Sequence, residues 1–421
     1  MNAVFKSGIA VVAFVGGIVG GYSWRDISSG SAPDLSGIGA ALKGEPKQTK
    51  DLSPTLTVAD AMSVIDSVFY GSPKRQDLTY DAVAGMLASL EDPHTMLLEP
   101  DLAERFEEKS TGHYVGIGAE LTRDPMGAKI KRVFKNSPAQ AIGLKPNDIV
   151  TRVDGKSVVG KDLFEVSESI RGESGSTVRL SVFRENTSQP LTFRVRRRAV
   201  DIQDVYGTVL QAGAPSVNVP IGYLEVRSFS ETIMSQFDEE LASLESRGIK
   251  GLIIDMRGNP GGLLSAAVDM SARFIDGKEI TRMKMRNGEP EVFVSPSGWA
   301  DGRTYPLVVL VDENSASAAE IFTGAIKIYH RGTIVGKRTY GKGSVQRMLS
   351  MADGSQIKLT IARYYLPNGE SIQRRETPEG EFISGGIEPD VEVEKDRLAV
   401  NGDPATDNQL RKAISIVSGK L

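Results

Sequence analysis

Residues 306–346 constrain the fold of this chain more than any other stretch of its sequence. The stretch opens with an unbroken apolar run, 306–311, which is typical of a strand buried on both faces in a parallel sheet. A short acidic turn, an apolar-faced helix, a second strand at 333–335 and a glycine-flanked lysine, Lys342, follow in that order. Two strands joined by a helix predict a parallel βαβ unit, and therefore an α/β domain.

Two serines, Ser315 and Ser317, stand where the turn meets the helix. Ser315 or Asn314 fits the role of helix cap, which places Ser317 in the first helical turn. The backbone N–H groups there lack intrahelical partners and can stabilise an oxyanion, so Ser317 is a candidate nucleophile. Serines at helix starts are more often simple caps, and this stretch taken alone favours that interpretation.

A second unit of alternating strands and helices precedes the first. We expect a strand at 221–226, an amphipathic helix at 231–247 and a buried strand at 251–256. The sequence Arg-Gly-Asn-Pro-Gly-Gly at 257–262 then leads into another helix, and its glycines either present free N–H groups or simply form a turn. Beyond residue 346 the pattern predicts antiparallel strands and a final amphipathic helix at 407–418.

Composition narrows the possible chemistry. The chain has 421 residues, enough for two or three domains, and its 50 basic and 54 acidic residues do not indicate a nucleic-acid-binding protein. It has no cysteine, so disulfides, thiolate metal sites and a cysteine nucleophile are excluded. Three histidines argue against a multi-histidine metal centre, and we expect neither a metal nor a cofactor.

The N-terminus predicts export. Residues 7–24 are largely apolar and follow Lys6, which indicates a signal anchor or signal peptide within 1–26. An A-x-A cleavage motif is missing, which favours an uncleaved anchor, with cleavage within 28–32 as the alternative. A flexible linker at 27–54 and a helical region at 55–110 follow.

Residues 111–198 change to short strands and glycine turns. The phrases S-P-A-x-x-x-G-L, from residue 137, and D-I-x-x-x-V-D-G, from residue 148, make this segment resemble a PDZ domain of the bacterial type. The resemblance implies that it binds protein C-termini. Gly116, Ile117 and Gly118 can point backbone N–H groups at a terminal carboxylate, whereas the simpler alternative is a glycine-rich hairpin without a ligand.

The residues present argue against two familiar kinds of functional site. A Ser-His-Asp triad needs a nearby histidine, but His330 ends the helix that Ser317 begins, about 20 Å away. Residues 336–342 fit the phosphate-loop pattern G-x-x-x-x-G-K, yet Gly343 replaces the required serine or threonine and a strand pattern follows. A serine–lysine dyad remains: it requires burial of Lys342, whereas a lysine in a loop is more often solvated. The amide of Gln346 could hold its amine.

Three motifs identify a family resemblance: Asn-Ser-Ala-Ser-Ala-Ala-Glu-Ile at 314–321, Thr-Tyr-Gly-Lys-Gly-Ser-Val-Gln at 339–346, and the glycine loop at 257–262. Together they resemble the C-terminal processing peptidases, also called tail-specific proteases. The resemblance implies an α/β multidomain protein: a helical N-terminal region, a PDZ β-sandwich-like module, and a crotonase-like or ClpP-like catalytic core at 199–398. A C-terminal helical segment at 399–421 would complete it.

The resemblance also implies the site. Ser317 lies 25 residues before Lys342, and Gln346 lies 4 residues after it, which are the family intervals for nucleophile, general base and orienting glutamine. Backbone N–H groups of Ala318 and a loop glycine, Gly261, would form the oxyanion hole. Arg171 matches a PDZ arginine that couples the ligand-bound module to the active site in some relatives. Ala319 replaces a third serine of many relatives, without consequence for catalysis.

The expected function is therefore that of a serine endopeptidase acting through an acyl-enzyme on proteins recognised by their C-termini. We expect it on the periplasmic side of a bacterial inner membrane, or in the periplasm if the signal is cleaved. A homo-oligomer and a helical-repeat lipoprotein adaptor are expected partners. A catalytically silent PDZ scaffold and an acyl-CoA enzyme of the crotonase type are the alternatives.

Overall fold

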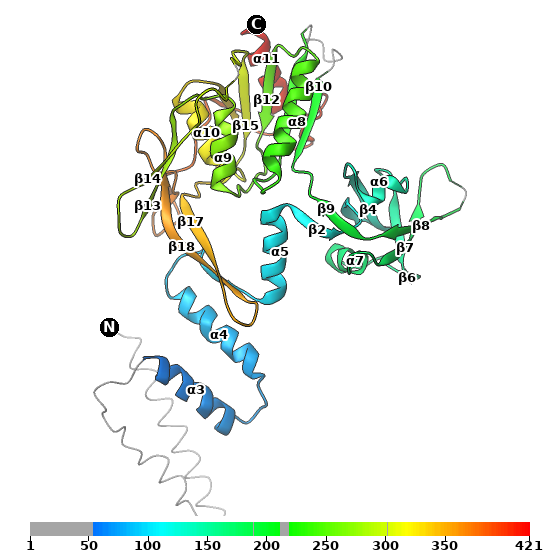
Figure 1. Ribbon diagram of the computed structural model, residues 1–421, viewed down its shortest axis with the longest axis vertical. Helices are drawn as coiled ribbons and strands as arrows, with labels where there is room; N and C mark the ends of the chain where they lie inside the picture. The colour runs from blue at the N-terminus through cyan, green and yellow to red at the C-terminus, as the bar shows by residue number, and fades with distance from the viewer. Residues whose placement is uncertain (1–53, 188, 211–218, 301) are drawn as a thin grey trace, which may run out of the picture. The chain divides into compact units, whose positions relative to one another are not determined.

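The computed structural model describes residues 54–187, 189–210, 219–300 and 302–421 (Figure 1). The chain divides into two compact units, Met1–Leu78 and Thr79–Leu421. Helix α3 (Pro54–Val68) lies in the first unit, and α4 (Arg75–Ala88) begins there. The predicted anchor, 1–26, and linker residues 27–53 lie outside the described residues. Within the described ranges, we find no helix with the length and apolar content needed to cross a membrane.

The predicted PDZ module is a curved antiparallel sheet with two helices. Its strand order is β3-β4-β5-β7-β8, with β6 beside β5, and a separate pair, β2 with β9, closes the module where the chain enters and leaves it. Ile130, Val150 and Leu180 are fully buried in its core. The elements of the module are β2 (His113–Gly116), β3 (Ala119–Asp124), β4 (Gly127–Val133), α6 (Pro138–Ala141), β5 (Ile149–Val153), β6 (Lys156–Ser157), α7 (Leu163–Ile170), β7 (Thr177–Phe183), β8 (Leu191–Arg196) and β9 (Arg198–Asp201), and α5 (Pro100–Thr111) precedes the module in the chain.

The α/β domain is built on a six-stranded sheet with the order β10-β11-β12-β15-β16-β21. Its neighbours pair in parallel except β10 and β11, so the predicted parallel βαβ arrangement is confirmed. The edge strand β10 was not predicted. The elements are β10 (Val205–Leu210), β11 (Ile221–Val226), α8 (Ile233–Ser246), β12 (Gly251–Asp255), α9 (Leu264–Ala272), β15 (Leu307–Val311), α10 (Ala318–Ile328), β16 (Thr333–Gly336), β21 (Val391–Glu392) and α11 (Asn408–Ser418).

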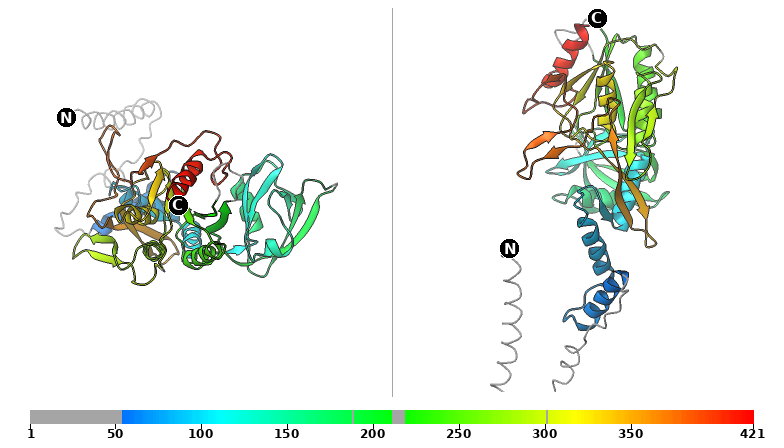
Figure 2. Two further views of the ribbon diagram at one scale, coloured as in Figure 1. Left: turned by 90° about the horizontal axis from the view of Figure 1, so that it is seen from above. Right: turned by 90° about the vertical axis from the view of Figure 1, so that its left-hand side faces the viewer.

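Helices cover both faces of this sheet (Figures 1 and 2). Leu252 and Ile254 of β12 pack into the cluster that contains α8, α9 and α10, whereas Ile253 packs into the cluster that contains α11. Alternate residues of one strand thus enter opposite cores, which explains why β12 and β15 are apolar without interruption.

A second, antiparallel sheet flanks the α10 side of the domain. It has the order β1-β18-β13-β14, with β17 also paired to β18. The β17–β18 hairpin was predicted, but the β13–β14 hairpin was not. The strands are β1 (Met96–Leu98), β13 (Glu279–Met285), β14 (Glu291–Val294), β17 (Ser344–Ser350) and β18 (Gln356–Tyr365), and a short outlying pair comprises β19 (Arg375–Glu376) and β20 (Phe382–Ser384).

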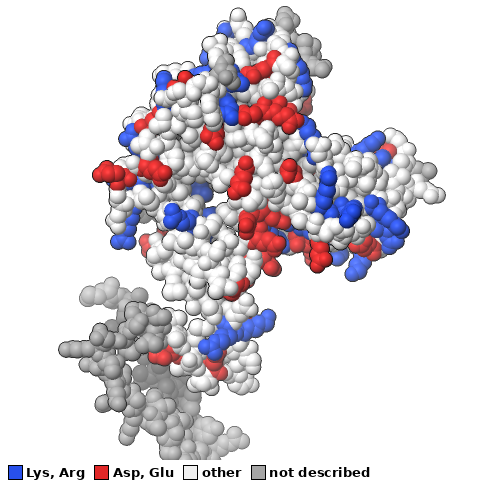
Figure 3. Space-filling model, viewed as in Figure 1, with Lys and Arg blue, Asp and Glu red and all other residues white. Residues whose placement is uncertain are grey.

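On the face drawn in Figure 3, basic and acidic side chains are interspersed. This mixture agrees with the near-balanced composition of the chain.

Candidate active site

Ser317 sits at the junction between β15 and α10. It is the N-cap residue of α10, one position earlier than the first-turn placement expected from sequence, and it has φ 55° and ψ −117°. A positive φ is costly for a residue with a side chain and persists only where surrounding contacts hold it. Ser315 lies in the preceding turn, where its hydroxyl donates to the carbonyl of Met256 at 2.8 Å and accepts from Asp312 N. Ser315 is therefore a turn residue.

Glu320 supplies contacts that hold Ser317. Its fully buried carboxylate accepts the Ser317 N–H at 2.8 Å, as the glutamate of a capping box does. It also accepts from Gly341 N at 2.7 Å, from Lys342 N at 2.8 Å and from the hydroxyl of Thr339. One carboxylate thus ties the serine turn to the lysine loop.

Lys342 is held in an environment that favours its neutral form. Burial, and beyond it the nearby ammonium of Lys358, lowers the pKa of Lys342 to about 8, although Glu320 and Asp92 act in the opposite direction. A lysine with this pKa has a substantial free-amine fraction near neutral pH, as a general base requires. No direct hydrogen bond joins Lys342 Nζ to Ser317 Oγ in the structure, a separation common in unliganded active sites.

Gln346 lies on β17, close in sequence to Lys342. Its amide nitrogen donates to Ser344 Oγ at 2.8 Å and to Thr360 Oγ1 at 3.2 Å. Within the described ranges, no donor contacts its amide oxygen. The role of Gln346 as the residue that orients the lysine stays a prediction.

The predicted oxyanion groups meet beside Ser317. The Ala318 N–H, the first of α10, donates to none of the residues that the structure describes. Gly261 has φ 94°, and a Cβ on it would lie 2.7 Å from Ser317 Cβ and 2.8 Å from Ala318 N. Only glycine therefore lets this loop approach the serine so closely. The Gly261 N–H itself donates to Asn259 Oδ1 at 2.8 Å, so its part in the oxyanion hole also stays a prediction.

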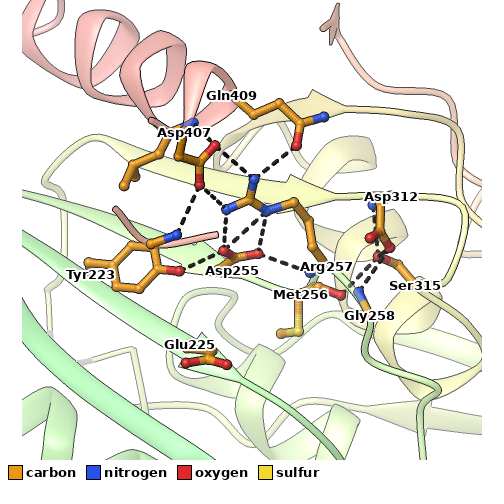
Figure 4. A network of polar contacts seen from close by, with 12 residues as sticks. Tyr223, Glu225, Asp255, Met256, Arg257, Gly258, Asp312, Ser315, Asp407 and Gln409 are labelled. Atoms are coloured by element: carbon orange, nitrogen blue, oxygen red, sulfur yellow. Dashed lines mark hydrogen bonds and ion pairs between the residues drawn. The ribbon is translucent and has the colours of Figure 1, made fainter. Parts of the chain in front are cut away.

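A buried ionic network anchors the loop that contains Gly261 (Figure 4). The side chain of Arg257 is fully buried and bridges Asp255, at 2.6 Å, to Asp407 at the start of α11, at 2.7 Å. Gln409 accepts a further hydrogen bond from Arg257 at 2.8 Å, and the Tyr223 hydroxyl donates to Asp255 at 2.6 Å. The network joins α11, β12 and the glycine loop in one polar cluster.

A cavity of about 630 Å³ lies in the region of the predicted PDZ peptide site. Gly116 and Ile117 line it, together with Phe164 of α7 and Phe106 of α5. Gly118, the third predicted peptide-binding residue, donates its N–H to the Tyr114 hydroxyl at 3.2 Å. Arg171 forms an ion pair with Glu108 of α5, and its guanidinium lies 5.3 Å from the ring centre of Tyr114.

Two parts of the site were missed by reasoning from sequence. Glu320 carries a signal that could have been found, because Ser317-Ala-Ala-Glu320 fits the capping-box pattern S-x-x-E. Arg257 was treated as part of a glycine turn, and nothing near it in the sequence points to Asp407, 150 residues further along.

Comparison with known proteins agrees with this architecture. Residues 220–393 match the model of peptidase family S41, and residues 129–184 match a PDZ domain model. The two matches define a class, that of serine-type peptidases that carry a PDZ domain. Carboxy-terminal processing protease CtpB of Bacillus subtilis (strain 168) is 31% identical over 396 residues, which cover 94% of this chain and 78% of the relative. The chain therefore belongs to the carboxy-terminal processing proteases of peptidase family S41.

A second relative and a solved structure are also similar to this chain. Carboxy-terminal processing protease CtpA of the same organism is 34% identical over 335 residues, or 79% of this chain and 68% of the relative. Among solved structures, a protein of Bacteroides fragilis NCTC 9343 assigned to the S41 proteases aligns with a TM-score of 0.53. The alignment covers 88% of this chain and 99% of that one at 16% identity, a likeness of fold alone.

Proposed function

We propose that this protein is an endopeptidase of the bacterial cell envelope in which Ser317 is the nucleophile and Lys342 the general base. The observation that carries the proposal is the shared carboxylate: Ser317 N and Lys342 N both lie 2.8 Å from Glu320 Oε2. This contact brings the strained serine and the lysine of lowered pKa into one small region of the molecule.

The mechanism follows from these groups. Ser317 Oγ attacks the carbonyl carbon of the scissile bond while Lys342 Nζ takes the hydroxyl proton. The carbonyl oxygen becomes an oxyanion and accepts the Ala318 N–H. Lys342 then returns the proton to the departing amine, which leaves an acyl-enzyme on Ser317. Water attacks this ester with Lys342 again as the base, and the new carboxyl terminus is released.

The PDZ domain implies that substrates are bound through their C-termini. We place the terminal carboxylate at the backbone N–H groups of the Gly116–Ile117–Gly118 turn, with the preceding residues paired along the edge of β3. Arg171, through its ion pair with Glu108, would relay occupancy of this site to α5. A homo-oligomer and a helical-repeat lipoprotein adaptor are further proposed partners.

We further propose that residues 1–26 anchor the protein with its folded part on the periplasmic side of the inner membrane. The apolar run at 7–24 and the polar linker at 27–54 support this placement. Fusion of a reporter that is active only in the periplasm to the C-terminus tests it: activity is expected, and an inactive but expressed fusion contradicts it.

Cleavage of an unfolded protein by the full-length enzyme in detergent tests the catalytic assignment. Ser317→Ala and Lys342→Ala should each abolish cleavage. Ser315→Ala should still cleave, because it retains the nucleophile. Undiminished cleavage by Ser317→Ala or Lys342→Ala would contradict the proposal. A substrate with an amidated C-terminus should compete less well than its free-acid form, because it lacks the carboxylate that the PDZ turn binds.

A further inference from the structure

Asn259 lies in the middle of the glycine loop at 257–262 and is fully buried. Its side-chain oxygen accepts the Gly261 N–H at 2.8 Å, which closes a turn around Pro260. Its side-chain nitrogen donates to the carbonyl of Val226, the last residue of β11, at 2.9 Å. One side chain thus shapes the loop and fastens it to the parallel sheet.

The two partners fix the orientation of this amide. A backbone N–H can only donate and a backbone carbonyl can only accept, so the oxygen of Asn259 must face Gly261 and its nitrogen must face Val226. An aspartate there would offer no donor at neutral pH, and a leucine of similar size would offer neither a donor nor an acceptor. The buried position therefore suits an asparagine in particular.

The backbone of Asn259 contacts the serine turn. Its carbonyl accepts the N–H of Ala316, the residue before the candidate nucleophile, at 2.9 Å. The next N–H, that of Ser317, is held by Glu320 at 2.8 Å. Two consecutive N–H groups are thus held from different segments, which fixes the backbone on both sides of Ala316. A serine with φ 55° keeps that conformation only where contacts of this kind hold it.

The glycine loop and the serine turn leave almost no space between them. A Cβ on Gly261 would lie 2.7 Å from Ser317 Cβ and 2.8 Å from Ala318 N. Gly261 is also held by Phe229, whose N–H donates to its carbonyl at 2.9 Å. Even a small shift of the loop would therefore reach the nucleophile and the first N–H of α10.

We propose that Asn259 is a positioning residue for the catalytic serine. It holds the glycine loop against the serine turn, and so fixes the place of Ser317 Oγ relative to the Ala318 N–H that receives the oxyanion. The proposal rests on the proposed function, because it assigns Asn259 a role in the reaction that Ser317 carries out.

The placement of these two groups matters for the chemical step. The oxyanion forms while Ser317 Oγ attacks, so the Ala318 N–H must lie within hydrogen-bond distance of the position that the oxygen reaches in the transition state. A misplacement of about 1 Å can lower the rate about 100-fold. Loss of the Asn259 side chain should therefore slow the chemical step and leave the binding of the substrate nearly unchanged.

Steady-state cleavage of one peptide by full-length variants in detergent tests the proposal. Labelling with a fluorophosphonate, run to completion, counts the competent serines, so that kcat is expressed per labelled site. Asn259→Ala removes both side-chain hydrogen bonds and should lower this kcat by about 10- to 100-fold with KM nearly unchanged. Asn259→Ser can still accept the Gly261 N–H and should lose only about 3- to 10-fold.

A transition-state analogue separates positioning from a general loss of structure. A peptide aldehyde adds to the serine Oγ, and the oxygen of the adduct occupies the place of the oxyanion. Its Ki should therefore rise in Asn259→Ala by the same factor as kcat/KM falls. Asn314→Ala, at an exposed position of the serine turn, is the matched control and should leave Ki and kcat unchanged.

Two results would overturn the positioning role. The first is full kcat per labelled site in Asn259→Ala, which would leave Asn259 with a role in folding alone. The second is a loss confined to KM, which would assign it to substrate binding. If Asn259→Ala does not fold, Asn259→Ser decides, and full kcat per labelled site in that variant counts against the role.

Ser317→Ala keeps the two proposals apart. Cleavage by the unmodified enzyme and its loss in Ser317→Ala test the proposed function without involving residue 259. If Ser317→Ala still cleaves, the proposed function is refuted. If it does not cleave, and both variants of Asn259 keep full kcat per labelled site, only the inference about Asn259 is refuted.

Discussion

Ser317 and Lys342 donate their backbone N–H groups to the same oxygen, Glu320 Oε2, at 2.8 Å each. The contact explains how a serine with φ 55° is stabilised while the lysine loop is held beside it. Glu320 lies in the first turn of α10, where a negative charge is favoured by the helix dipole. Burial raises the pKa of this carboxylate, and its four hydrogen bonds act in the opposite direction.

Replacing Glu320 should therefore impair catalysis through geometry. Glu320→Gln keeps the shape but replaces one acceptor oxygen with a donor, so at least one of the Ser317, Gly341 and Lys342 N–H groups loses its partner. We expect kcat to fall by about 10- to 100-fold, measured by peptide cleavage. Glu313→Gln, at an exposed position of the preceding turn, is the control. Unchanged kcat in Glu320→Gln would show that the serine turn holds without the charge.

The charge of Lys358 should set the pH at which the base becomes active. Burial lowers the pKa of Lys342, Lys358 lowers it further, and the carboxylates of Glu320 and Asp92 act in the opposite direction. Because Lys358→Met removes a repelling positive charge, the pKa of Lys342 should rise, and the acidic limb of kcat/KM should move up by about half to one pH unit. Lys358→Arg keeps the charge and should leave the limb in place. A downward shift in Lys358→Met would refute this account.

Lys342 should lower the stability of the folded protein. Its pKa in the folded chain is about 8, below the ordinary 10.5, so the unfolded chain binds more protons between these values and stability rises with pH across that window. Below pH 8 the full cost of burying the charged amine of Lys342 lowers the stability of the fold. Lys342→Met should therefore raise the free energy of unfolding at pH 7 by about 1–3 kcal/mol, measured by urea denaturation.

Two controls accompany this measurement. The exposed Lys250, replaced by methionine, should change stability by less than about 0.5 kcal/mol. The gain in Lys342→Met should shrink as the pH is raised from 8 toward 10.5. A gain that does not depend on pH would point to better packing by methionine instead of to the charge.

The Arg257 network should be a major source of stability for the α/β domain. Asp407→Ala leaves the buried guanidinium with Asp255 as its remaining carboxylate partner, and breaking a buried pair costs about 3–5 kcal/mol. Urea denaturation should show this loss at pH 7, whereas the exposed Glu231→Ala should be nearly neutral. A loss below about 1 kcal/mol would mean that α11 is held by its apolar face alone.

The same pair predicts an acid dependence. Burial raises the pKa of Asp407, but hydrogen bonds and charge from Arg257 outweigh it, and the pKa lies below the ordinary 3.8. The contribution of the pair is therefore complete above pH 3.8 and is lost as the pH falls through the folded value. The stability difference between the unmodified chain and Asp407→Ala should narrow only in that acid range.

Much of the fold was readable from local pattern. The apolar run at 306–311 predicted β15, and alternation after residue 346 predicted the β17–β18 hairpin, because periodicity is a property of neighbouring residues. The β13–β14 hairpin was not predicted, although Met283, Lys284 and Met285 of β13 do alternate apolar and charged residues. The N-cap position of Ser317 was not predicted either, although Ser317-Ala-Ala-Glu320 fits the capping-box pattern.

The sequence by itself determined the α/β class, the PDZ module and the spacing that selects Ser317 over Ser315 as the candidate nucleophile. Only the tertiary structure decided which buried groups support that serine and lysine. Glu320 contacts the lysine loop and Arg257 contacts Asp407, both distant in the chain, and a buried polar group is stable only where a partner meets it in the folded state. Such pairings leave no periodic trace in the sequence, so only the folded chain reveals them.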